Sequence, residues 1–216
     1  MICDFLQSLK LAFVYQLQAF RGNIPTKEPL SVISNLGYLF AALFALFTDL
    51  LVVKWLVFIS LTYLFAGSTL YHATGLSKYG HMDEQGMYLV GTSLAGAFLS
   101  TQFPVAYTPI IIIFCAVVGI FMAVSYNRLS SFTTTGLLFA SVLISAFLTG
   151  IIKGVPNWPW AMLFFFVISS LIRLSQRHYF PEDLHVPSPP RDAIHMVWHI
   201  MTSIGFVLFL KLMTYV

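Results

Sequence analysis

Seven apolar stretches, each near the length of a membrane-crossing helix, constrain this chain more than any other feature of its sequence. They lie near residues 30–48, 52–73, 83–102, 105–126, 132–151, 157–174 and 193–213. A helix needs about 20 mostly apolar residues to cross the hydrocarbon core of a bilayer. The pattern therefore predicts an all-α fold, a bundle of seven transmembrane helices.

The composition leaves little chain outside such a bundle. Only 9% of the 216 residues are charged, whereas a soluble domain carries about 25%. At roughly 30 residues for each span and its connection, seven spans use the whole chain. We therefore expect a single membrane domain over 1–216 and no soluble catalytic module. The net charge of +3 contains no long basic run, so binding to nucleic acid is not expected.

The N-terminal stretch differs from the seven spans. In residues 1–20 the large apolar side chains repeat at helical spacing along one face, and Gln7, Lys10 and Gln18 lie elsewhere. Such an amphipathic pattern is typical of a helix that lies on a membrane surface. We predict a short interfacial helix here. The two cysteines, Cys3 and Cys115, are too few for a disulfide framework or a thiolate zinc site.

The basic residues predict the orientation. If the spans alternate in direction, eight lysines and arginines lie on the side of the N-terminus and three on the other. Because lysine and arginine collect in cytoplasmic loops, this bias places the N-terminus on the cytoplasmic side.

Polar and ionisable residues inside the predicted spans gather at three places. Ser68 and His72 are four residues apart near the end of the second span, Asp83 opens the third, and His195 and His199 are four apart near the start of the seventh. Each such group costs a few kcal/mol at the centre of a span, so each needs a reason. The end of an even span and the start of an odd one lie on the same side of the membrane. We therefore expect all five residues at one depth near the cytoplasmic face.

Three imidazoles at one depth indicate a metal site. Residues four apart share a helical face, so His195 and His199 can point to one centre together with His72. Three histidines with an open fourth position for water form a typical catalytic zinc site. In this interpretation Asp83 accepts a proton from the water and returns it to the leaving group, and Ser68 stabilises the developing oxyanion.

Each of these residues also has a structural interpretation. A pair of histidines on a membrane helix can serve only to hydrogen-bond neighbouring helices. Asp83 can cap the helix that it opens, and Ser68 can be a small residue at a helix contact. Asp192 either caps the seventh span or orients His195. We expect His81 to lie in a loop.

A second polar row enters the first span. Glu28, Ser31 and Asn35 follow one another there at helical spacing. Packing between helices and support for the predicted pocket explain this row equally well.

These residues resemble the signature of the CREST superfamily of seven-span membrane proteins, which includes alkaline ceramidases and the progestin and adipoQ receptors. The signature looks like S-x-x-x-H in the second span, an aspartate opening the third and H-x-x-x-H in the seventh. Here it reads as Ser68 to His72, Asp83, and His195 to His199. The resemblance covers most of the chain.

Within that superfamily the details look closest to alkaline ceramidases. The ten residues between His72 and Asp83, the Trp198-His199 step, and Glu28 with Ser34-Asn35 all resemble that family. Its ceramidases also bind calcium through an acidic N-terminal segment. This chain has no carboxylate between Asp4 and Glu28, so the calcium site is not carried over. The ceramidases place the zinc site on the lumenal side, whereas the basic residues here favour the cytoplasmic side, as in adipoQ receptors.

The sequence thus predicts a zinc-dependent intramembrane hydrolase that cleaves the amide bond of a ceramide-like lipid and releases a fatty acid and a sphingoid base. The residues themselves support an enzyme that takes a lipid substrate from the bilayer, because the spans around the site are apolar. The amide bond is implied by the resemblance alone. Two other functions stay open. One is a receptor or structural protein with a zinc site and little turnover, and the other is a proton-coupled transporter with a relay of these residues.

Overall fold

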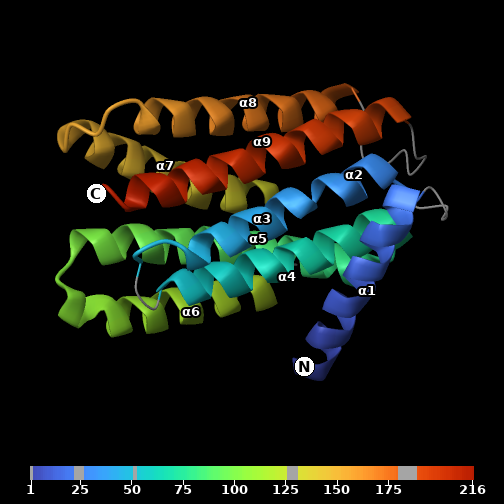
Figure 1. Cartoon of the computed structure of the whole chain (residues 1–216), viewed down its shortest axis with the longest axis horizontal. Coiled ribbons are helices and arrows are strands. Elements are labelled where there is room, and N and C mark those ends of the chain that lie inside the picture. The colour runs from blue at the N-terminus through green and yellow to red at the C-terminus, as the bar shows by residue number, and fades with distance from the viewer. Residues whose placement is uncertain (1, 22–26, 51–52, 126–130, 180–188) are drawn as a thin grey trace.

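A computed structural model of the chain describes residues 2–21, 27–50, 53–125, 131–179 and 189–216, and their regular elements are all helices (Figure 1). The helices are α1 (Ile2–Arg21), α2 (Pro29–Ser34), α3 (Leu36–Leu46), α4 (Val53–Thr74), α5 (Ser77–Gln102), the 3-10 turn η1 (Val105–Tyr107), α6 (Thr108–Val124), α7 (Ser131–Ile152), α8 (Trp158–Tyr179) and α9 (Pro189–Met213). The all-α prediction is confirmed.

Five segments among the described residues are long and apolar enough to cross a membrane. They are Pro29–Leu46, Val53–Thr74, Val105–Val124, Trp158–Gln176 and Pro189–Met213. The predicted spans at 83–102 and 132–151 do not reach that standard. Polar residues at the start of α5 lower its hydropathy, and in α7 (Ser131–Ile152) the apolar stretch over which side chains are described is Gly136–Ile152. The structure thus indicates a multi-pass membrane protein.

The long helices α4, α5, α8 and α9 run roughly along one axis, and α1 crosses them at an angle (Figure 1). One face of α1 packs on α4 and α2, where Ala12 is fully buried and Gln16 is 3% exposed. Gln16 Nε2 donates to Val32 O at 2.5 Å and to Thr69 Oγ1 at 3.2 Å. These hydrogen bonds fix the buried face of α1 to the bundle. Apolar side chains elsewhere on α1, such as Leu17 and Phe20, are exposed.

Helices α4 and α5 form the closest pair in the bundle, and two glycines allow it. A Cβ at Gly67 of α4 would lie 2.7 Å from the backbone nitrogen of Asp83, and one at Gly86 of α5 would lie 2.8 Å from Cα of Leu64. Small residues let helix backbones approach in this way. Gly67 therefore brings the start of α5 against the end of α4, next to Ser68.

Helix α5 begins earlier than the predicted third span. Its N-cap is Leu76, and it follows a turn in which Gly75 has a φ of +67°, a conformation that glycine adopts without strain. Asp83 therefore lies in the second turn of α5 and does not cap it. His81, which was expected in a loop, also lies on this helix.

Candidate metal centre

Three histidines from two distant parts of the chain meet at one end of the bundle. His72 lies near the end of α4, and His195 and His199 lie in the first half of α9. All three are buried, and a ligand nitrogen from each lies within 4.8 Å of the others. The ring centroids of His195 and His199 are 4.4 Å apart, and those of His72 and His195 are 4.6 Å apart. The prediction that these residues share one centre is confirmed.

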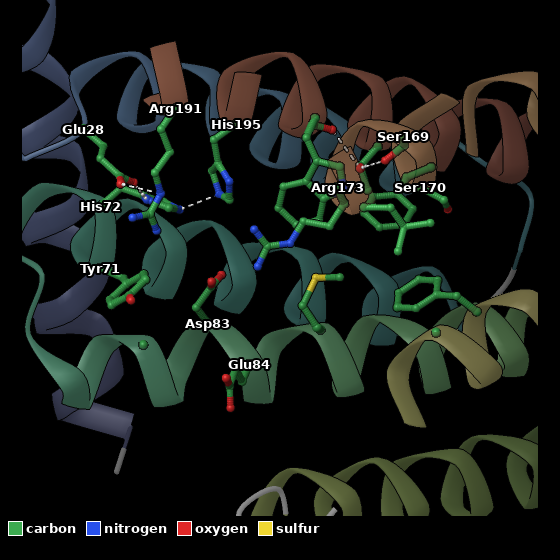
Figure 2. Close-up of a pocket in the computed structure, with 18 of the residues that line it drawn as sticks. Glu28, Tyr71, His72, Asp83, Glu84, Ser169, Ser170, Arg173, Arg191 and His195 are labelled. Carbon is green, nitrogen blue, oxygen red and sulfur yellow. Dashed lines mark hydrogen bonds and ion pairs between the residues drawn. The ribbon is translucent and has the colours of Figure 1, made fainter. Parts of the chain in front are cut away.

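The orientation of His72 is fixed by Glu28, the residue that precedes α2. Glu28 Oε2 accepts a hydrogen bond from His72 Nδ1 at 2.5 Å (Figure 2). Burial raises the pKa of the Glu28 carboxyl, but the hydrogen bond and charge of His72 and the nearby Arg191 outweigh it, so this pKa lies below its ordinary value. An ionised carboxylate can only accept. The proton of this hydrogen bond is therefore on Nδ1, and Nε2 of His72 is the nitrogen that faces His195.

The orientation of His195 is fixed by Gln176 of α8. Its Oε1 lies 2.9 Å from His195 Nδ1 and accepts a second hydrogen bond, also 2.9 Å long, from Arg173 Nη1. Because arginine can only donate, this contact identifies the oxygen end of the amide. His195 must then donate through Nδ1, and its Nε2 keeps a lone pair.

The orientation of His199 is fixed by Ser34 of α2. Ser34 Oγ donates its one proton to the carbonyl of Ser31 at 2.9 Å, and it lies 3.0 Å from His199 Nδ1. The hydroxyl has no second proton to give. It therefore accepts from His199 Nδ1, which leaves Nε2 of His199 unprotonated as well.

These three contacts make the cluster fit a metal ion. Each imidazole donates its Nδ1 proton to a different partner, which is the arrangement that orients histidine ligands in metal sites. The Nε2 atoms of His72 and His195 lie 3.1 Å apart. In a tetrahedral site with ligands at about 2.0–2.1 Å, neighbouring nitrogens are separated by roughly 3.3 Å. At this distance either the proton of a hydrogen bond or a metal ion lies between the two nitrogens. The donor set is compatible with zinc.

Asp192 has a different role from either one considered for it. Its carboxylate accepts hydrogen bonds from the backbone nitrogens of Leu30 and Ser31 at 2.9 and 2.8 Å and from Ser31 Oγ at 2.5 Å. These are free donors in the first turn of α2, so Asp192 of α9 caps a helix about 160 residues away in the chain. The Glu28 nitrogen also donates to the carbonyl of His72 at 3.2 Å. These bonds hold the segment that contains Glu28 and Ser34 against the histidines.

Asp83 and Ser68 lie beside the cluster in different settings. The Asp83 side chain points from α5 into the cavity, toward Arg173 and the histidines (Figure 2). Ser68 is 1% exposed and interacts with the Asp83 carboxyl, although its Oγ makes no hydrogen bond of regular geometry among the described residues. Its hydroxyl is thus available beside Asp83. Glu84 points away from the histidines (Figure 2).

A cavity of about 1000 Å³ adjoins the cluster and lies among α4, α5, α7, α8 and α9. Its polar end contains His72, His195 and Asp83, together with cationic side chains. Its other walls come from α7, α8 and α9 and are mostly apolar, with the hydroxyls of Ser169, Ser170 and Thr202 among these side chains: Phe139, Ala140, Leu143, Phe166 and Phe206. A long apolar chain fits against such walls, while a polar group reaches the histidines.

Two residues of this site, Gln176 and Arg173, were missed in the sequence. Both lie near the end of the sixth predicted span, in the segment RLSQRH. A polar side chain at that depth was a usable signal, since such groups need partners within the bundle. Tyr38 of α3 was also missed. It is 1% exposed, its ring centroid lies 5.4 Å from that of His199, and its hydroxyl has no hydrogen-bond partner among the described residues.

Comparison with protein-family models and with curated proteins finds no match to this chain.

Proposed function

We propose that this protein is a zinc-dependent intramembrane hydrolase that cleaves the amide bond of a ceramide-like lipid. One observation carries the proposal: three buried imidazoles, each with a different polar partner at Nδ1, come together beside a carboxylate and a lipid-sized cavity. A purely structural cluster of histidines would not need the cavity. Zinc is proposed as the ion because the donor set consists of nitrogen atoms, which suit it.

The residues of the site divide the work as follows. His72, His195 and His199 would hold a divalent ion, which would supply a Lewis acid for a carbonyl group and strongly lower the pKa of a water molecule at that position. Asp83 accepts the proton that the attacking water loses and passes it to the departing amine. Ser68 donates a hydrogen bond that steadies either Asp83 or the developing oxyanion. Glu28, Gln176 and Ser34 fix the orientation of the three imidazole rings.

The substrate class follows from two separate arguments. The apolar walls of the cavity support an acyl lipid that enters from the bilayer. The amide bond and the sphingoid base rest on the resemblance of Ser68 to His72, Asp83 and His195 to His199 to alkaline ceramidases.

The membrane arrangement belongs to the same proposal. The packing of α5 and α7 beside the five apolar segments supports a seven-span bundle. The exposed apolar face of α1 rests in the membrane interface. The excess of basic residues places the N-terminus and the metal centre on the cytoplasmic side.

The test is an assay of the purified protein in detergent with lipid amides and matched lipid esters. We expect amide hydrolysis that a zinc chelator stops and added zinc restores. Asp83→Asn should lower kcat about 10²–10⁴-fold, while its zinc content stays near one ion per chain. The matched control is Asp49→Asn, an exposed residue in the turn after α3, which should keep full activity. Turnover that is unaffected by either the chelator or Asp83→Asn would refute the mechanism.

A further inference from the structure

Cationic side chains gather at the polar end of the cavity, and three different parts of the chain supply them. Arg173 lies on α8, Arg191 in the first turn of α9, and Lys27 just before α2. All three line the same cavity as His72 and His195. A cavity that served only a neutral lipid would need none of these charges in its wall.

Arg173 lies at the centre of this group. Its Nη1 donates a hydrogen bond to Gln176 Oε1, and its guanidinium carbon lies 5.2 Å from the centroid of the Trp198 ring. In Figure 2 its guanidinium extends into the cavity between Asp83 and His195. Because these two contacts hold it in place, the planar guanidinium of Arg173 is preorganised to bind a planar or tetrahedral anion.

Arg191 extends the cationic surface away from the metal centre. It precedes His195 by one helical turn, and its Nε lies 3.9 Å from Glu28 Oε1. Because α9 begins at this end of the bundle, Arg191 lies nearer the membrane surface than His195 does. In Figure 2 the guanidinium groups of Arg173 and Arg191 lie on either side of His195, so a ligand bound at the histidines has a cation on each side.

The charges in the cavity wall do not cancel once a metal is bound. Three cations line it, Lys27, Arg173 and Arg191, and so do three carboxylates, those of Glu28, Asp83 and Glu84. A divalent ion at the neutral histidines would add two positive charges to a balanced set. A low-dielectric cavity with excess positive charge favours an anionic ligand.

We propose that the lipid cleaved here carries an anionic group, a carboxylate or a phosphate, on its amine half, and that Arg173 and Arg191 bind this group. This inference rests on the proposed function for the position of the scissile amide. The acyl chain occupies the apolar part of the cavity, against Phe139 and Phe206. The amide lies at the histidines, and the anion lies beside it, between the two arginines. Arg173 and Arg191 are thus specificity-determining residues.

The test compares two lipids with the same acyl chain, N-oleoylglycine and N-oleoylethanolamine, which differ by a carboxylate in place of a hydroxymethyl group. We expect kcat/KM of the zinc-loaded protein to be at least about 10-fold higher for the anionic lipid, as a charge-assisted contact provides. The ratio of the two kcat/KM values should fall at least about 10-fold in R173Q/R191Q and less in R173K, which keeps the charge but loses the fork. Lys78→Gln, an exposed cation outside this cavity, should leave the ratio unchanged.

Binding separates this inference from the proposed function. The zinc-loaded Asp83→Asn protein should bind N-oleoylglycine more tightly than N-oleoylethanolamine, measured by thermophoresis in detergent, whether or not the wild type cleaves either lipid. A preference in binding without turnover would overturn the proposed function and support the inference. Equal or weaker binding of the anionic lipid, or a preference that R173Q/R191Q retains, would overturn the inference.

Discussion

Helices α4 and α6 differ in a way that hydropathy alone would not predict: α6 is the more apolar of the two, yet α4 is the more deeply buried. The segment Val105–Val124, which includes α6, has a mean hydropathy of 2.5, yet 22% of its most apolar window is buried. The segment Val53–Thr74, which is α4, has a mean hydropathy of 1.4 and is 67% buried by the same measure. Side chains such as Ile113 and Phe121 of α6 are exposed, at 65% and 68%.

The difference follows from the solvent. Lipid tails are as apolar as leucine, so an exposed apolar helix loses nothing at the surface of a membrane bundle. Polar and small residues, by contrast, need partners or close backbone contact inside. Helix α4 carries Gly67, Ser68 and His72 within one and a half turns. Those residues, and not its hydropathy, give α4 its central position.

The largest expected effect is on metal binding, which should depend on α4 and not on α6. His72→Ala on α4 should abolish stoichiometric zinc and lower hydrolysis more than about 10³-fold, because it removes a ligand. Cys115→Ala on α6 should change neither, although Cys115 is a buried potential ligand. Zinc content by mass spectrometry and turnover of a lipid amide check both variants. Retention of one zinc per chain in His72→Ala would mean that the histidines are not the ligands.

The next effect tests the partner of the α4 histidine. Glu28→Gln keeps the shape of the side chain but removes the charge that holds the Nδ1 proton of His72. We expect zinc affinity to fall about 10–100-fold, measured by competition with a chelator. Glu84→Gln, which alters a carboxylate that points away from the histidines (Figure 2), should leave the affinity within about twofold. Equal losses in the two variants would point to a general charge effect.

A smaller effect concerns the close approach of α4 and α5. A Cβ at Gly67 would meet the backbone of α5 at 2.7 Å, so Gly67→Ala should destabilise the protein by about 1–3 kcal/mol through overpacking. At Gly96 the nearest atom to an added Cβ is Cys115 Sγ at 3.4 Å, an ordinary contact, and Gly96→Ala should cost less than about 0.5 kcal/mol. Unfolding in mixed micelles gives both values, and equal values would contradict the packing assigned to Gly67.

The smallest effect lies on the outer surface of α6. Ile113→Ala removes a large side chain that is 65% exposed, so the free energy of unfolding should change by less than about 0.5 kcal/mol. Leu64→Ala in the core of α4 should cost about 2–5 kcal/mol, because it leaves a cavity. A loss of similar size at Ile113 would show that α6 has a protein neighbour in place of lipid.

Much of the fold and the centre of the site could be predicted from the sequence. Five of the seven apolar windows overlap segments that are long and apolar enough to cross a membrane, and the spacing of His72, His195 and His199 together with alternating direction predicted their convergence. The start of α5 could not be read in this way. Its first six residues, Ser77 to Met82, include a serine, a lysine, a glycine and a histidine and so resemble a connection, whereas in the structure they are helical and belong to a helix that packs against α4.

The partners of the histidines were harder to predict. Asp192 caps α2 and Gln176 binds His195, and both contacts join parts of the chain that no local pattern connects. Hydrogen bonds of this kind depend on how helices pack, whereas the sequence shows only that a polar residue needs some partner. Glu28 and Ser34 stood out as polar residues at the first span, but which nitrogen each would contact required coordinates.

Zinc X-ray absorption spectroscopy of the metal-loaded protein tests the central claim most directly. The account predicts three imidazole nitrogens at about 2.0–2.1 Å and one oxygen at about 2.0–2.2 Å, with no sulfur neighbour. It also predicts that the imidazole signal is lost in His199→Ala. A first shell without imidazole, or a protein that holds no zinc when it is purified with the ion present, would contradict it.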